Sequence, residues 1–86
     1  MDLPKNRFKA ALKNGERQYG LWCTIPNSTV VEVLAGCGYD WLVLDTEHTS
    51  ADAGHVLPML QTAAAYPVNA VVRPGWNDPV EIKRML

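Results

Sequence analysis

Three short apolar stretches divide the chain, and segments with helical spacing lie between them. The second stretch is a continuous apolar run closed by an aspartate, which fits a strand buried on both faces, as parallel sheets require. The stretches follow one another at roughly 20 to 30 residues, a spacing typical of right-handed βαβ units. They predict strands at residues 19–24, 41–44 and 68–72.

The first two helices are predicted from their start and stop signals. Asp2 is a suitable N-cap for a first helix, with Pro4 in the first turn and Gly15 as the stop. Thr29 and Glu32 have the spacing of a capping box at the start of a second helix. The chain is therefore expected to open with a helix and to place another after the first strand.

The third and fourth helices follow the second and third strands. Ser50 is the predicted cap of the third helix, and Pro58 inside it predicts a bend or a late start. The dipeptide 66–67, Tyr-Pro, is expected to end it. Asp78 caps the fourth helix, with Pro79 at its first position, where proline is favoured.

The predicted pattern is one helix followed by three βα units, and the last helix reaches Leu86 without a stop signal. A three-stranded parallel sheet leaves two unprotected edges. A complete eight-fold α/β barrel takes about 250 residues. We therefore expect residues 1–86 to be the N-terminal part of one larger α/β domain, and the isolated fragment to aggregate or to fold loosely.

Composition excludes several classes of protein. Apolar residues make up 48% and charged residues 20%, with a net charge of -1, which is globular rather than disordered. There is neither a basic stripe for nucleic acid nor an apolar segment of about 18 residues for a membrane. The N-terminus lacks the apolar region of a secretory signal. Cys23 and Cys37 are expected to be reduced, mostly buried thiols, so we predict a cytoplasmic protein.

Polar residues gather where the predicted strands end. Asp45 closes the second strand, Glu47 and His48 follow it, and Arg73 closes the third. In parallel α/β barrels, active sites are built at this end of the strands. His48 can act as a general base, with Asp45 holding one tautomer of its imidazole. The alternative is a loop histidine without a task, and for Glu47 a capping or salt-bridging role is equally open.

Arg73 can bind a carboxylate through two parallel hydrogen bonds or stabilise an enolate oxygen. The alternative is a structural ion pair with Asp45 or Glu47. Trp22 ends the first strand and is either a wall of the pocket or part of the core. Trp41 and Trp76 are expected to be packing residues, and His55 an exposed residue without a partner.

At these residues the sequence resembles the HpcH/HpaI aldolase family, the metal-dependent class II pyruvate aldolases. The likeness spans nearly the whole chain, and its most specific parts are the Asp-x-Glu-His and Val-Arg-Pro segments at this separation. The matching stretches are residues 6–9, 20–22, 38–48 and 71–79.

The resemblance implies a TIM barrel that cleaves a 4-hydroxy-2-oxo acid to pyruvate and an aldehyde. It implies that His48 is the catalytic base, working with Asp45 and a metal-bound water, that Arg73 holds the pyruvate carboxylate or enolate, and that Glu47 supports the metal-bound water. A divalent cation of the Mg²⁺ or Mn²⁺ type would stabilise the enolate. In the family its ligands are a Glu and an Asp on later strands, which would lie beyond Leu86.

Two alternatives accompany this interpretation. The 86-residue chain can be a non-catalytic piece that needs the missing strands or a partner chain. It can also come from a citrate-lyase-like enzyme acting on an acyl-CoA thioester, although no feature here calls for CoA. The resemblance further suggests a trimeric or hexameric homo-oligomer.

Overall fold

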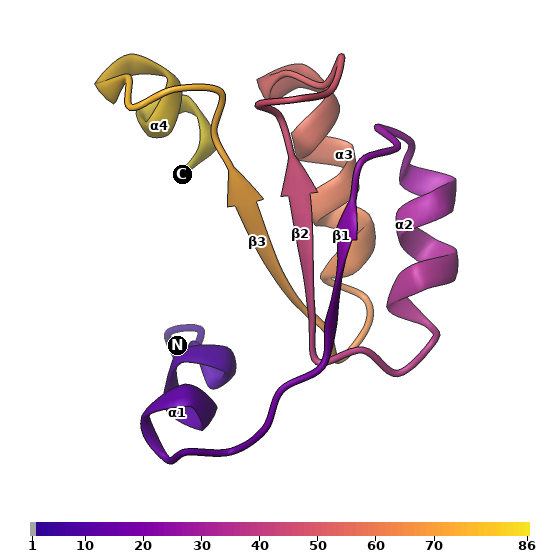
Figure 1. Cartoon of the computed structure of the whole chain (residues 1–86), viewed down its shortest axis with the longest axis vertical. Helices are drawn as coiled ribbons and strands as arrows, with labels where there is room; N and C mark the ends of the chain where they lie inside the picture. The colour runs from indigo at the N-terminus through magenta and orange to yellow at the C-terminus, as the bar shows by residue number, and fades with distance from the viewer. Residues whose placement is uncertain (1) are drawn as a thin grey trace.

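A parallel three-stranded sheet forms the centre of the computed structural model, which describes residues 2–86. Its strands are β1 (Gly20–Cys23), β2 (Trp41–Asp45) and β3 (Asn69–Arg73), in the order β1-β2-β3 (Figure 1). The predicted strands and their parallel arrangement are confirmed to within a residue or two at their ends. The register pairs Asp45 with Arg73, so both side chains leave the sheet at the same end.

The described helices are α1 (Arg7–Lys13), α2 (Ser28–Ala35), α3 (Ala53–Ala63) and α4 (Pro79–Met85). Helices α2 and α3 lie side by side against one face of the sheet, while α1 lies near the end where the strands begin (Figure 1). Helix α4 follows β3 at the opposite end. Each strand is therefore followed by a helix, which is the predicted βα repeat.

The core lies between the sheet and the helices α2 and α3. Because alternate residues of a strand point to opposite faces, Leu42 and Leu44 of β2 face the helices together, and both are fully buried. They pack in one cluster with Val31 of α2 and Met59 of α3. Burial of such a side chain contributes about 1.5–3 kcal/mol, so this cluster is what holds the βα units together.

The opposite face of the sheet is open at the level of its middle row. Trp22, Val43 and Val71 share that row in register. The Trp22 residue is 48% exposed and Val71 37% exposed. Among residues 2–86, α2 and α3 cover the face that carries the core, and Phe8 of α1 contacts the opposite face at Trp41, where β2 begins.

Three helix starts differ from the prediction. The caps are Asn6, Asn27 and Asp52 rather than Asp2, Thr29 and Ser50, and each accepts amide N–H groups of the first turn. Asn, Asp and Ser are about equally good caps and Thr is somewhat weaker, so the sequence offers more than one suitable cap near the start of each helix. The cap at Asp52 is reciprocal, because Asp52 N donates to His55 Nδ1 at 3.3 Å in return. The same ring nitrogen lies 2.8 Å from Asp52 Oδ1. His55 is exposed, as expected, but has this partner.

Pro58 lies inside α3, and the helix runs on past it to Ala63. The helix begins at Ala53, two residues later than a cap at Ser50 implies, yet Pro58 still lies in its interior, and it ends before the predicted stop at 66–67. A proline has no N–H, so the carbonyl four residues earlier lacks its helical donor. The start of α4 is as predicted, with Asp78 accepting from Val80 N at 3.0 Å.

Two residues expected in the core are exposed. Cys37 lies at the surface, whereas Cys23 is buried, and both are free thiols. Trp76 is 77% exposed, whereas Trp41 packs against Phe8 of α1 with ring centroids 6.2 Å apart. None of the helices in the described part of the chain is long and apolar enough to cross a bilayer.

Candidate active site

A bidentate ion pair joins the carboxyl ends of β2 and β3. Arg73 Nε donates to Asp45 Oδ1 at 3.0 Å, and Arg73 Nη2 donates to Asp45 Oδ2 at 2.7 Å. The strand register brings the two residues together across 28 positions of sequence. The ion pair that the sequence left open as an alternative for Arg73 is therefore present.

The Asp45 carboxylate is the centre of the site. Its side chain is only 2% exposed, and it accepts three further hydrogen bonds, from Trp22 Nε1 (3.2 Å), Glu47 N (2.9 Å) and His48 N (3.4 Å). The Arg73 guanidinium holds the pKa of this carboxyl far below its usual range, and the other donors add to the effect against the cost of burial. Asp45 is thus a fixed anion that organises the loop after β2.

Two threonine hydroxyls complete that loop. Thr46 donates from Oγ1 to the Arg73 carbonyl at 2.6 Å and from its backbone N at 3.1 Å. Thr49 Oγ1 donates to the Asp45 carbonyl at 2.6 Å. Neither threonine was predicted from the sequence to have a role, although hydroxyl residues just after a strand often form such local hydrogen bonds. They keep both strand-end carbonyls satisfied and so stiffen the backbone that presents His48.

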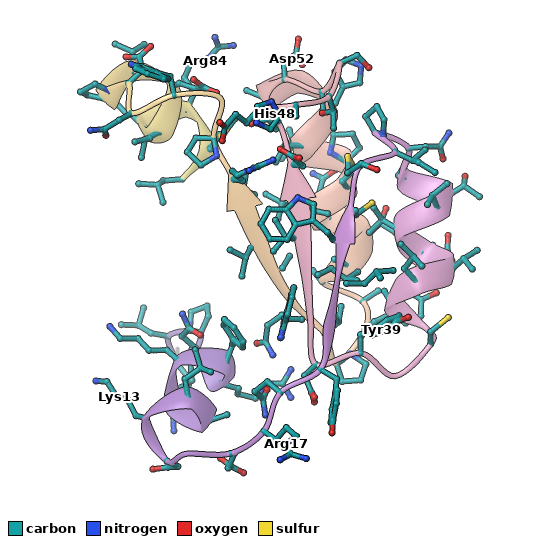
Figure 2. The ribbon with its side chains drawn as sticks, viewed as in Figure 1. Lys13, Arg17, Tyr39, His48, Asp52 and Arg84 are labelled. Atoms are coloured by element: carbon teal, nitrogen blue, oxygen red, sulfur yellow. The ribbon has the colours of Figure 1, made fainter. Side chains whose placement is uncertain are left out.

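His48 does not contact Asp45 through its ring. The imidazole is 71% exposed, and its Nε2 lies 3.3 Å from Glu47 Oε1 (His48 is labelled in Figure 2). The expectation that Asp45 holds the His48 tautomer is therefore wrong in this structure. The physical reason is that the two carboxylate oxygens of Asp45 already accept five hydrogen bonds.

Glu47 lies between His48 and Arg73. One carboxylate oxygen is near His48, and the other, Oε2, is 3.4 Å from Arg73 Nε. Its side chain is 36% exposed. Of the roles open from sequence, the structure shows salt bridging, and it places Glu47 rather than Asp45 beside the imidazole.

Arg73 keeps hydrogen-bonding capacity beyond its pair with Asp45. A guanidinium has five N–H donors, and in residues 2–86 its hydrogen bonds involve Nε and Nη2 but not Nη1. The fork formed by Nη1 and the second Nη2 hydrogen is the edge that matches a carboxylate. The pKa of Arg73 is raised, chiefly by its hydrogen bond to Asp45, so the group is always charged.

Trp22 lies at the site and not in the core. Its half-exposed indole has Arg73 Cζ 4.9 Å from the ring centroid, within the roughly 6 Å of a cation–π contact. This exposure argues against the alternative of a core residue. The role of Trp22 as a pocket wall stays a prediction.

A cavity of about 350 Å³ opens next to Arg73. Its size lies in the range of small-molecule sites. Glu81 of α4 accepts from Gly75 N at 2.8 Å and so anchors the loop that forms its outer side. The lining residues are Glu47, Arg73, Pro74, Gly75, Trp76, Asn77 and Ile82.

The described residues do not fit a divalent cation. Between residues 2 and 86, no three His, Cys, Asp or Glu side chains come together as a metal-binding group. Asp45, the most buried carboxylate of the site, is already bound by Arg73. The ligands predicted beyond Leu86 stay a prediction.

Comparison with known proteins shows the family of this chain. Residues 18–86 match the family model described as HpcH/HpaI aldolase/citrate lyase. The chain is 58% identical over its whole length to a hydroxypyruvate/pyruvate aldolase of Sagittula stellata, and 54% identical over 82 residues to a 4-hydroxy-2-oxo-heptane-1,7-dioate aldolase of Shigella sonnei. It covers 34% and 31% of those relatives.

A solved structure gives the same fold. The HpcH/HpaI aldolase/citrate lyase family protein from Burkholderia cenocepacia J2315 superposes with a TM-score of 0.89 and 37% identity, over 93% of this chain and 32% of that one. The chain thus spans about a third of the length of the relatives it matches, and the expectation of part of a TIM barrel is confirmed. The matched family model covers most of the chain, and the chain belongs to the HpcH/HpaI aldolase/citrate lyase family.

Proposed function

We propose that this chain carries the carboxylate-binding and proton-transfer part of an aldolase that cleaves a 4-hydroxy-2-oxo acid to pyruvate and an aldehyde. The observation that carries the proposal is the Arg73 guanidinium, held by Asp45 with its Nη1 edge unused, beside the exposed His48. The names of the similar aldolases, a hydroxypyruvate/pyruvate aldolase and a 4-hydroxy-2-oxo-heptane-1,7-dioate aldolase, support it.

In this proposal Arg73 binds the oxo-acid end of the substrate. Its remaining fork donates two charge-assisted hydrogen bonds to the carboxylate, or donates to the oxygen at C2 as negative charge develops there. The pair with Asp45 prevents the guanidinium from turning away, so the orientation is set before the substrate arrives. Trp22 forms the wall under it.

His48 is the proposed base. Its ring is accessible, and an imidazole nitrogen can accept a proton from a substrate hydroxyl. His48 removes the proton of the C4 hydroxyl, and the C3–C4 bond breaks as C4 becomes the carbonyl of the leaving aldehyde. The electron pair of the broken bond forms the C2–C3 double bond, and the C2 oxygen takes the negative charge of the enolate. Returning the proton to C3 gives pyruvate, so atoms and charge balance.

The charges around Arg73 give a reason for a further cation. Asp45 and Glu47 are two anions beside one arginine, so with neutral His48 the cluster carries a charge of about -1. Such a cluster attracts an anionic substrate poorly. A divalent cation of the Mg²⁺ or Mn²⁺ type, with ligands beyond Leu86, would correct that balance, and no step assigned to residues 2–86 depends on it.

Exchange of the pyruvate methyl protons in D₂O tests the proposal. The full-length protein, with Mn²⁺ added, is expected to catalyse the exchange, and His48→Ala is expected to lower its rate by about 10²- to 10⁴-fold, the usual contribution of a general base. His55→Ala is the matched control, because His55 is also an exposed histidine, but its ring contacts Asp52, the cap of α3, instead of Glu47. Unchanged exchange in His48→Ala would contradict the assignment of the base.

A second proposal concerns the 86-residue chain alone. The open sheet face, with Trp22 and Val71 exposed, favours a non-catalytic piece that needs further strands or a partner chain. The isolated chain is then expected to aggregate and to show no exchange. A sharp, cooperative thermal transition of a monomer would contradict this proposal.

A further inference from the structure

The indole of Trp22 contacts both members of the buried ion pair. Its Nε1 donates to Asp45 Oδ2 at 3.2 Å, and its ring lies under Arg73, with Cζ 4.9 Å from the centroid. A residue that only walls a pocket needs neither contact. The double contact therefore points to an effect of Trp22 on the pair itself.

The two contacts meet on one oxygen. Asp45 Oδ2 accepts both from Trp22 Nε1 and from Arg73 Nη2, the latter at 2.7 Å. The indole N–H thus fixes the oxygen that receives Nη2, while the ring face attracts the guanidinium from below. The N–H edge and the ring face of the Trp22 indole together fix the plane of the Arg73 guanidinium.

Packing does not account for Trp22. The neighbouring residues of β1, Leu21 and Cys23, face the helices and belong to the core or pack against it. Trp22 points to the other face and stays 48% exposed. A large aromatic side chain left half exposed contributes less burial than its size allows, so its contacts with the pair are the distinctive feature of this position.

We propose that Trp22 is a positioning residue for Arg73, which it orients through Asp45 and through its own ring so that the Nη1 edge faces the substrate carboxylate. This inference rests on the proposed role of Arg73. Removing the indole lets the guanidinium adopt other orientations, which weakens substrate binding more than it slows bond cleavage.

A double-mutant cycle in the full-length protein tests this, with pyruvate as the probe. Trp22→Leu removes both contacts and is expected to raise the KM for pyruvate about tenfold with a smaller change in kcat, whereas Trp22→Phe keeps a ring face and is expected to lie between. In an Arg73→Lys background, Trp22→Leu is expected to change KM by less than about twofold, because residues that act through one another are not additive.

Additive effects would overturn the inference. If Trp22→Leu raises KM about tenfold in both backgrounds, Trp22 contacts the substrate independently of Arg73. Tyr19→Phe is the control, because Tyr19 is an exposed aromatic residue just before β1, at its opposite end, and KM is expected to stay unchanged. If Trp22→Leu fails to fold, the Trp22→Phe arm of the same cycle gives the answer.

The outcome also separates this inference from the proposed function. If the wild-type protein exchanges no pyruvate protons, the proposed function fails. The same cycle read on thermal unfolding then shows whether Trp22 and Arg73 are coupled, and the absence of coupling there would overturn the positioning role as well. If the wild-type protein does exchange pyruvate protons but the effects on KM are additive, only the positioning role of Trp22 is rejected, and the proposed function stands.

Discussion

The two ends of the sheet contrast sharply. Helix α1 lies at the end where the strands begin (Figure 1). There Phe8 of α1 packs against Trp41, and the Trp41 indole fills the space beside Gly20. At the end where they finish, Asp45 and Arg73 form a charged pair next to an exposed histidine. In parallel barrels the first end stabilises the fold and the second carries chemistry. The charged residues Asp45 and Arg73 thus lie at the end of the strands where parallel barrels build their active sites.

The largest expected effect is a loss of stability when the charge of Asp45 is removed without a change in its shape. Asp45→Asn keeps the volume but removes the anion that pairs with Arg73, and breaking a buried pair in this way costs roughly 3 kcal/mol or more. Chemical denaturation of the two proteins measures the loss. Glu47→Gln is the control, since Glu47 is partly exposed and its contacts are longer. A loss as large in the control would remove the distinction between the two carboxylates.

The next effect is the acid dependence of stability. Because the pKa of Asp45 is lowered by Arg73, the folded state binds fewer protons here than the unfolded state, whose pKa is about 4. The stabilisation is therefore complete above about pH 4 and declines as the pH falls below it. Unfolding measured from pH 6 to pH 2 is expected to be steeper for the wild type than for Asp45→Asn.

Asp52 titrates in the same direction, since its pKa is lowered chiefly by its hydrogen bond to His55. The comparison is therefore made in an Asp52→Asn background, which removes that contribution. Equal slopes with and without Asp45 in this background would show that the buried pair does not control acid stability.

A smaller effect is expected at the opposite end of the strands. A Cβ added at Gly20 would overlap the Trp41 ring, so Gly20→Ala forces the indole to move and costs about 1–3 kcal/mol. Pyruvate exchange by the folded protein is expected to remain, because the site lies at the other end. Gly36→Ala is the control, since its Cβ would meet only ordinary contacts. Loss of exchange in folded Gly20→Ala would mean that the two ends are coupled.

The smallest effect concerns the cap of α1. Asn6 Oδ1 accepts from Lys9 N at 2.9 Å, and Asn6→Ala is expected to cost about 1 kcal/mol through loss of this cap. The midpoint of thermal unfolding measures it, with Asn14→Ala at the other end of α1 as the comparison. If Asn6→Ala lowers the stability more than Gly20→Ala does, then α1 contributes more to stability at this end of the sheet than the packing of Trp41 beside Gly20.

Much of the fold could be read from local patterns. The run that ends at Asp45 and the Asp78–Pro79 start of α4 were predicted correctly, because burial on both faces and proline at the first helical position leave marks on adjacent residues. Caps were less certain, because suitable side chains such as Asn27 and Thr29 lie close together and both can accept an amide N–H.

By itself the sequence determined the repeat of strands and helices and the placement of Asp45, His48 and Arg73 near strand ends, since both follow from order along the chain. Only the tertiary structure decided which groups meet. It placed Arg73 on Asp45, the His48 ring beside Glu47, and Trp22 under the guanidinium. Those contacts depend on the register of strands far apart in sequence and on how many donors one carboxylate can accept, and neither is recorded in local spacing.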